Sequence, residues 1–326
     1  MNKRNWILGI GLLAALVGFI YLANSSHETA SSSHRIGVFQ VVRHPALDSM
    51  AQSFQETLES RFPGRVQFDV QIPEGDAAKT EQMSERFAIG KYDLVFVIGT
   101  NLAQSLSKKT RTMPIVLGGA TDPQAAGLVD SWEKPGRNIT GTSDLSPVGE
   151  QLDRLRQIMG HAKRVGIIYN PSEDNSKIIL AHFVKACEAR SLTPVPVTIS
   201  SPNDIQQTIV SQVGKVDAIY APTDATVQSA FPALIKIANE VQLPVFDCDE
   251  GTVRAGAMFS VGFNYGDLGR TSAEMAAAIL EGEAMPRDLA IRLVGTSTLY
   301  YNPTRIQSLG LVVPEEWSRE GVKVSE

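Results

Sequence analysis

The stretch "VDAIYAPTDATV", residues 216–227, ends an apolar run on a polar cluster. The apolar part is rich in Val, Ile and Ala and does not alternate, which is typical of a parallel strand covered on both faces. Thr223, Asp224 and Thr226 then stand where a helix is expected to begin. In open α/β sheets the carboxyl end of a strand is where ligands bind. The stretch therefore predicts a strand–loop–helix unit whose loop carries polar side chains toward a possible ligand.

The same unit recurs along the chain from Arg35 onward, and each short apolar run precedes a helical stretch. This alternation favours a doubly wound α/β fold with parallel sheets. The predicted strands cover residues 35–42, 66–72, 92–99, 114–119, 164–170, 194–199, 216–222, 244–247 and 257–263.

Two irregular pieces interrupt the series of strands and helices. In the first, Pro135 and Gly136 mark a turn, residues 138–144 form a short extended piece, and Pro147 opens a new helix. The series restarts at Arg164, so we interpret this piece as a crossing between two similar lobes. The second piece, "FDCDEGTVRAGA", is interpreted as a return crossing to the first lobe.

The N-terminus has the composition of an export signal. Lys3 and Arg4 precede an uncharged apolar segment, residues 6–23. No clean small-x-small cleavage site follows it, so residues 1–23 are expected to be either a signal peptide or an uncleaved membrane anchor. The Ser-rich residues 24–34 are expected to form a flexible tether, and no lipid-anchor cysteine is present there.

Composition and motif searches exclude several classes of function. A net charge of -5 gives no indication of a nucleic-acid partner. No Walker loop or Gly-x-Ser-x-Gly elbow occurs, and the five histidines have no metal-type spacing. We therefore expect no enzyme activity, no cofactor and no metal. His44 is expected to cap, line a cleft or pack, and Cys187 and Cys248 are expected to be buried free thiols rather than a disulfide.

Polar residues follow most of the predicted strands, and two interpretations fit them. Ser, Thr, Asn and Asp at these junctions are typical helix N-caps. The same helix starts expose N–H groups that suit a carboxylate ligand, while Asp224 and Asp249 are suited to an ammonium group. The second interpretation predicts a pocket for a zwitterion between the two lobes.

Six ordered motifs make the chain similar to a known family: "VVRHPALD", "GATDPQAAGLV", "EKPGRNITGTSD", "RVGIIYNPSEDNS", "VDAIYAPTDATV" and "YGDLGRTSAEMAAAIL". Over residues 35 to about 317 it resembles ABC-transporter substrate-binding proteins of the tryptophan- or phenylalanine-binding type. The resemblance implies a periplasmic-binding-protein type I fold, with two lobes joined by a three-crossing hinge. The implied lobes are residues 35–143 plus 250–285, and residues 144–249 plus 286–326.

The resemblance also implies the site. Asp224 is expected to contact the ligand's amine. The expected ligand-binding residues are Gln40, Thr100, Thr121, Asp122, Ser143, Asn170, Asn175, Thr223, Asp224 and Asp249.

The expected function is that of an extracytoplasmic receptor of an ABC importer. The implied partners are a small ligand that resembles an amino acid, together with a permease and an ATPase. The resemblance extends to members that bind aromatic amino acids, and the implied oligomeric state is a monomer. The expected location is periplasmic, with anchoring to the inner membrane if the N-terminal segment stays uncleaved. A membrane-tethered sensor that uses the same clamp is the alternative. Sugar-responsive repressors share the fold, but here an apolar segment stands where they carry a DNA-binding motif.

Overall fold

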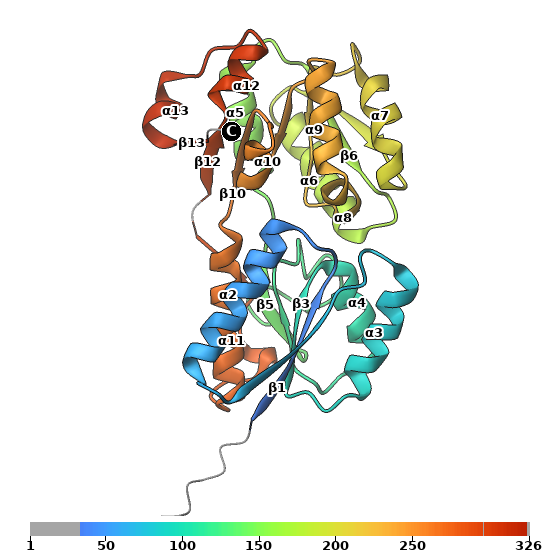
Figure 1. The fold of residues 1–326 in the computed structure, drawn as a ribbon, viewed down its shortest axis with the longest axis vertical. Helices are drawn as coiled ribbons and strands as arrows, with labels where there is room; N and C mark the ends of the chain where they lie inside the picture. The colour runs from blue at the N-terminus through green and yellow to red at the C-terminus, as the bar shows by residue number, and fades with distance from the viewer. Residues whose placement is uncertain (1–32, 296, 325–326) are drawn as a thin grey trace, which may run out of the picture.

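The computed structural model describes residues 33–295 and 297–324, which form two α/β lobes stacked along the long axis (Figure 1). In the first lobe the strand order is β11-β5-β4-β3-β1-β2, and the paired strands are parallel. Its elements are β1 (His34–Gln40), α2 (Pro45–Arg61), β2 (Val66–Gln71), α3 (Ala77–Ile89), β3 (Leu94–Ile98), α4 (Thr100–Lys109), β4 (Ile115–Leu117), β5 (Ile139–Ser143), α11 (Tyr265–Leu280), η2 (Pro286–Asp288) and β11 (Arg292–Leu293).

The second lobe has the strand order β13-β12-β10-β9-β8-β6-β7, parallel except for the β10–β12 pair. Its elements are α5 (Val148–Ile158), β6 (Arg164–Tyr169), α6 (Asp174–Glu188), β7 (Thr193–Thr198), η1 (Pro202–Asp204), α7 (Ile205–Gln212), β8 (Ala218–Tyr220), α8 (Ala225–Ser229), α9 (Phe231–Glu240), β9 (Val245–Asp247), α10 (Glu250–Arg254), β10 (Phe259–Gly262), β12 (Thr298–Tyr301), α12 (Pro303–Ser308), α13 (Glu315–Glu320) and β13 (Val322–Lys323). The predicted doubly wound fold is confirmed, and each predicted strand overlaps an observed one.

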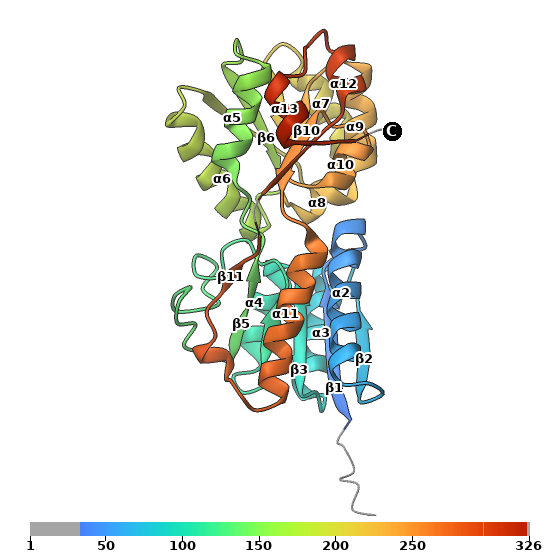
Figure 2. The same cartoon turned by 90° about the vertical axis from the view of Figure 1, so that its left-hand side faces the viewer.

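Three segments connect the lobes, and two of them lie further along the chain than expected (Figure 2). The first crossing follows Ser143, as expected. The second follows Gly262 instead of residue 249, because β10 pairs with β9 in the second sheet. The third follows Leu293 instead of residue 285, because β11 pairs with β5 in the first sheet. The polar piece interpreted as the return crossing is instead the loop and short helix α10 that lead into β10.

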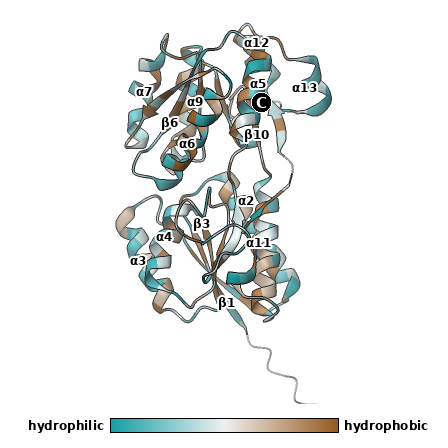
Figure 3. Ribbon diagram, turned by 180° about the vertical axis from the view of Figure 1, so that it is seen from behind, coloured by the Kyte–Doolittle hydropathy of each residue, from teal (hydrophilic) through white to brown (hydrophobic). Residues whose placement is uncertain are grey.

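Apolar strands and the inner faces of the helices form a core in each lobe, and the outer helix faces are mostly hydrophilic (Figure 3). Helix α11 returns to the first lobe and packs against α2. At Gly269 a Cβ atom would lie 2.1 Å from the carbonyl oxygen of Met50, so only glycine permits this close approach. Cys187 and Cys248 are buried free thiols, which confirms that expectation.

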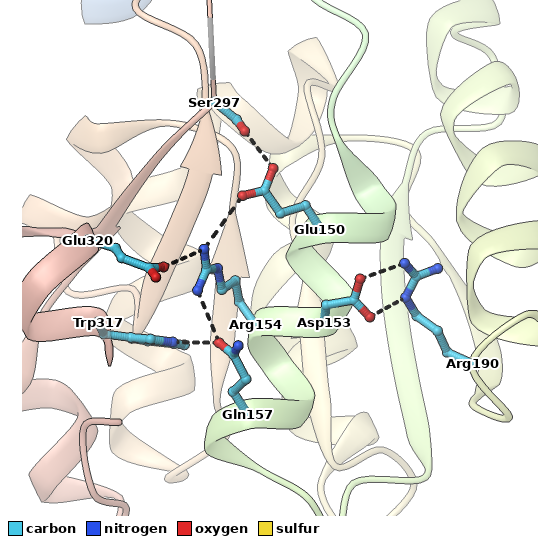
Figure 4. A network of polar contacts seen from close by, with 8 residues as sticks. All are labelled: Glu150, Asp153, Arg154, Gln157, Arg190, Ser297, Trp317 and Glu320. Carbon is cyan, nitrogen blue, oxygen red and sulfur yellow. Dashed lines mark hydrogen bonds and ion pairs between the residues drawn. The ribbon is translucent and has the colours of Figure 1, made fainter. Parts of the chain in front are cut away.

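A polar network joins helix α5 to the third crossing and to the C-terminal helix α13 (Figure 4). Ser297 donates a hydrogen bond to the Glu150 carboxylate, and Arg154 forms an ion pair with Glu320 at 3.2 Å. Trp317 donates its indole N–H to the side-chain oxygen of Gln157 at 2.7 Å. Helix α5 follows the first crossing and Ser297 ends the third, so one helix fixes the second-lobe ends of two crossings.

No helix among the described residues is both long enough and apolar enough to span a bilayer. The segment expected to be a signal or an anchor, residues 1–23, and all but the last two residues of the expected tether lie outside the described residues.

Candidate functional site

A cavity lies between the two lobes, where the carboxyl ends of strands from both sheets face each other. Asp144, in the first crossing, and Tyr265, where the chain re-enters the first lobe, lie beside the hinge. The other lining residues are Val41, Val42, His44, Ala46, Leu47, Ile98, Gly99, Thr100, Asn101, Gly119 and Thr121 from the first lobe, and Glu173, Asn175, Thr223, Ala225, Gln228 and Asp249 from the second.

Five of the ten predicted site residues line this cavity: Thr100, Thr121, Asn175, Thr223 and Asp249. They come from both lobes and follow five different strands. They meet because carboxyl ends of parallel strands lie at one edge of each sheet, and here the two edges are opposed.

The other five predicted residues, Gln40, Asp122, Ser143, Asn170 and Asp224, support the walls of the cavity without lining it. The Gln40 amide donates to the Val42 carbonyl at 2.8 Å and to Asp48 at 2.6 Å. Ser143 donates to the Thr121 carbonyl at 2.7 Å. Asp122 accepts hydrogen bonds from the two backbone N–H groups of Gln124 and Ala125 and from the Trp132 indole.

Asp224 is fully buried, and its carboxylate is already occupied by protein donors. It accepts hydrogen bonds from the backbone N–H of Asn170 at 2.6 Å, the hydroxyl of Ser176 at 2.6 Å and the backbone N–H of Val227 at 2.8 Å. Burial, and then the nearby Glu173, raise the pKa of Asp224 to about 7. Asp224 is therefore the N-cap of α8 and holds β6 and α6 beside it. Its side chain does not line the cavity, so it is not placed for the expected contact with the ligand's amine.

Asp144 is not among the predicted site residues, although it directly follows the predicted Ser143. It lines the cavity from the first crossing, and its Oδ1 atom is buried without a hydrogen-bond partner among the described residues. Burial raises the pKa of Asp144 to about 7. A buried carboxylate oxygen without a donor is costly, so this group is suited to receive a proton or a ligand cation.

Asp249 and His44 face the same cavity from opposite lobes. Burial raises the pKa of Asp249, and His44 partly opposes that effect. Burial lowers the pKa of His44, and its Nδ1 accepts the Ala46 backbone N–H at 3.3 Å, which caps α2. The expectation that His44 caps a helix and lines the cleft is confirmed.

Two helix starts at the cavity differ in their capacity to bind an anion. At α8, the Glu173 carboxylate accepts the backbone N–H groups of Ala225 at 2.9 Å and Thr226 at 3.0 Å. At α4, the N-cap is Gly99, which provides no side-chain cap. Gly99 has a φ of 124°, a conformation that glycine tolerates, and the first residues of α4 line the cavity. The α4 start therefore presents N–H groups and a partial positive charge to a ligand.

Two further buried polar atoms in lining residues lack a partner among the described residues: the hydroxyl of Thr223 and the side-chain oxygen of Gln228. Leaving such atoms unpaired costs about 1–3 kcal/mol each. The remaining wall is largely apolar, with Val41, Leu47 and Ile98 in the lining. The cavity can therefore hold a small molecule with a cationic end, an anionic end and an apolar body.

Comparisons with known proteins agree with this arrangement. Residues 35–325 match the family model described as "ABC transporter substrate binding protein". The chain is 33% identical over 293 residues to a "Tyrosine-binding protein" of Clostridioides difficile, which covers 89% of this chain and 85% of the relative.

Two solved structures have nearly the same sequence identity to this chain but superpose on it to different degrees. An ABC domain from Streptococcus pneumoniae in complex with L-Trp is 33% identical, with a TM-score of 0.87 over 90% of this chain and all of that chain. A ligand-free, open substrate-binding protein from Clostridium difficile is 35% identical, with a TM-score of 0.68 over 90% of this chain and 99% of that chain. Because the identities are nearly equal, the higher score indicates that the lobes here are arranged as in the L-Trp complex.

Less similar structures show the same fold alone. A solute-binding protein of Bacillus halodurans with bound myo-inositol is 15% identical, with a TM-score of 0.62 over 86% of this chain and 98% of that chain. The matched family consists of substrate-binding proteins and not of enzymes. From its residues 35–325 and its similarity to these relatives, the chain belongs to the ABC transporter substrate-binding protein family.

Proposed function

We propose that this chain is the extracytoplasmic receptor of an ABC importer and that it binds an aromatic amino acid in the interlobe cavity. The observation that carries the proposal is that one cavity holds both the buried acid Asp144, whose Oδ1 has no partner among the described residues, and the uncapped start of α4. The partners of the receptor would be a permease and an ATPase, as the family membership suggests.

The cationic end of the ligand is assigned to Asp144 and Asp249. Both carboxylates line the cavity, and no Lys or Arg is among its lining residues. Burial raises the pKa of both acids, so each gains from an ammonium that neutralises it. Asp224 is assigned a structural role, because three protein donors already fill its carboxylate.

The anionic end of the ligand is assigned to the start of α4, near Thr100 and Asn101. Unpaired N–H groups there, together with the helix dipole, bind a carboxylate without a basic side chain. Thr121, Asn175 and Thr223 line the same cavity and are assigned further polar contacts.

The aromatic body is assigned to the apolar part of the wall, which includes Val42, Leu47 and Ile98. The named ligands of two relatives, tyrosine and L-Trp, support this choice. Both relatives are more than 30% identical to this chain over most of its length.

A calorimetric titration with matched ligands tests the proposal. Tyrosine, tryptophan and phenylalanine are compared with tyramine, which lacks the carboxylate, and with 3-(4-hydroxyphenyl)propionate, which lacks the amine. An aromatic amino acid should bind and raise the melting temperature, because it binds only the folded protein. Each truncated analogue should bind at least tenfold more weakly, since a buried charge in the site then loses its partner.

Leucine, glucose and myo-inositol serve as controls of ligand class. Binding of a sugar or polyol with no binding of any aromatic amino acid would overturn the proposal. Equal affinity for tyrosine and 3-(4-hydroxyphenyl)propionate would remove Asp144 and Asp249 from the site.

A further inference from the structure

Helices α4 and α6 approach each other across the cleft, at a place beyond the cavity that holds the proposed ligand. The Gln104 side-chain amide on α4 donates a hydrogen bond to Asp174 Oδ2, the first residue of α6, at 3.1 Å. The backbone N–H of Asp174 donates to Asn101 Oδ1 at 3.3 Å. Neither Gln104 nor Asp174 lines the cavity. The Gln104–Asp174 bond therefore joins the lobes outside the cavity, whereas Asn101 belongs to the cavity wall.

Each partner of the Gln104–Asp174 bond is held in place by its own lobe. The Gln104 amide also donates to the carbonyl of Ala126 in the first lobe, at 3.0 Å. In the second lobe, Lys177 forms an ion pair with Asp174 and holds the pKa of that carboxyl below its usual value. The Gln104 amide and the ionised Asp174 carboxylate are thus each oriented within their own lobe, which lowers the entropic cost of forming the bond.

We propose that Gln104 and Asp174 form a closure latch that holds the two lobes together over the bound ligand and so sets how long the ligand stays. This inference rests on the proposed function, because a latch matters only if a ligand binds between the lobes. A ligand shifts an equilibrium between open and closed states by its differential affinity, and bonds made only in the closed state add to that difference. These bonds break before release, so they act on the dissociation rate constant.

A second contact between the lobes supports the latch. His182 on α6 lies 3.9 Å from the Asp122 carboxylate, which follows β4. His182 lies about two helical turns after Asp174 on α6, and the contact again pairs a side chain of one lobe with one of the other. The likeness of the lobe arrangement to that of the L-Trp complex is what a closed latch requires.

The test uses two substitutions of nearly equal size and opposite charge at one position. Gln104→Glu places a carboxylate against Asp174, and Gln104→Lys places an ammonium there. Tyrosine or tryptophan, whichever binds the unmodified chain, is the probe in stopped-flow and calorimetric measurements. For a hydrogen bond of ordinary strength, Gln104→Glu should raise the dissociation rate constant by about three- to tenfold, with little change in the association rate constant. Gln104→Lys should leave it unchanged or lower it.

The matched control is a Gln–carboxylate pair that lies within one lobe. Gln52 on α2 donates to Glu56 at 2.8 Å, and both side chains are exposed. Gln52→Glu and Gln52→Lys should leave both rate constants unchanged. Small-angle scattering with saturating ligand adds a readout of shape, since Gln104→Glu should increase the fraction of extended molecules.

The outcomes separate the two proposals. If the unmodified chain binds no aromatic amino acid, the proposed function fails before any variant is measured. If it binds and the two Gln104 variants change dissociation equally, or not at all, the latch is wrong while the proposed function stands. Opposite effects of the two variants support the latch, since a merely structural role of Gln104 would not depend on the sign of the charge.

Discussion

Two buried acids, Asp224 and Asp144, lie in different settings at the same cleft. Asp224 stands between a strand and a helix, and three protein donors surround its carboxylate. Asp144 stands in the first crossing between the lobes, and its buried Oδ1 has no partner among the described residues. The oxygens of an acid at a helix start accept hydrogen bonds from the unpaired N–H groups of that helix. An acid in a crossing has no helix start beside it to supply such donors. Asp224 therefore stabilises the wall of the site, whereas Asp144 keeps an oxygen free for the proposed ligand.

The largest expected effect comes from removing the structural acid. Asp224→Ala leaves the N–H groups of Asn170 and Val227 and the hydroxyl of Ser176 without their acceptor. We expect the free energy of unfolding to fall by about 3–5 kcal/mol, measured by urea denaturation.

The control is Asp76→Ala, the loss of an exposed N-cap that accepts one hydrogen bond from Lys79. It should cost about 1 kcal/mol. Equal losses for the two variants would show that the cluster around Asp224 adds nothing to an ordinary cap.

The next effect comes from neutralising the proposed ligand acid. Asp144→Asn should weaken binding of an aromatic amino acid by about 2–4 kcal/mol, because the ammonium loses its buried partner. The free energy of unfolding without ligand should not fall, since the variant no longer buries a carboxylate whose Oδ1 has no donor among the described residues. Calorimetry and urea denaturation measure the two quantities. Unchanged affinity would show that Asp144 does not contact the amine and would leave that contact to Asp249 alone.

Asp144 also predicts a pH dependence of stability. The pKa of Asp144 is about 7 in the folded protein and 3.8 as its ordinary value, so the folded state binds the extra proton between these values. Stability contributed by that proton is present at low pH and is lost as the pH rises through 7. The difference in unfolding free energy between Asp144→Asn and the unmodified chain should therefore grow in favour of the variant from pH 5 to 8.

Ligand affinity should change in the opposite direction. An ammonium favours the ionised carboxylate, so affinity should rise with pH, by about tenfold per unit at most, and level off above pH 7. Asp144→Asn should lack this slope when titrations are repeated from pH 5 to 8. A slope retained in the variant would assign the proton to another group, such as Asp249 or His44.

The smallest effect separates two neighbouring threonines. The Thr223 hydroxyl lines the cavity and has no partner among the described residues, whereas the Thr226 hydroxyl bonds to Glu173 at 2.7 Å. Thr223→Val should weaken ligand binding by about 0.5–1.5 kcal/mol and leave the unfolding free energy nearly unchanged. Thr226→Val should do the reverse. The same pair of measurements, calorimetry and urea denaturation, distinguishes them.

The fold was largely predictable from sequence, and the crossings were not. Apolar runs that exceed the length of a turn predicted strands such as β6 and β10 at nearly their observed positions. The strands β11 and β13 have two residues each, are exposed and show no apolar run in the sequence. Their pairing decides which lobe the C-terminal segments of the chain join. The polar piece before β10 contains Gly251 and Gly256, which favour a crossing on sequence alone, but it only turns back into its own sheet.

The sequence by itself determined the alternation of strands and helices, and with it the polar rim where strands end, because both follow from local periodicity and capping chemistry. Only the tertiary structure decided which polar groups remain free for a ligand. Whether an acid such as Asp224 or Asp144 keeps its carboxylate available depends on donors far away in sequence, as the bond from Asn170 to Asp224 shows. Pairing across such distances is fixed when the sheets and lobes pack, and no local pattern of residues records it.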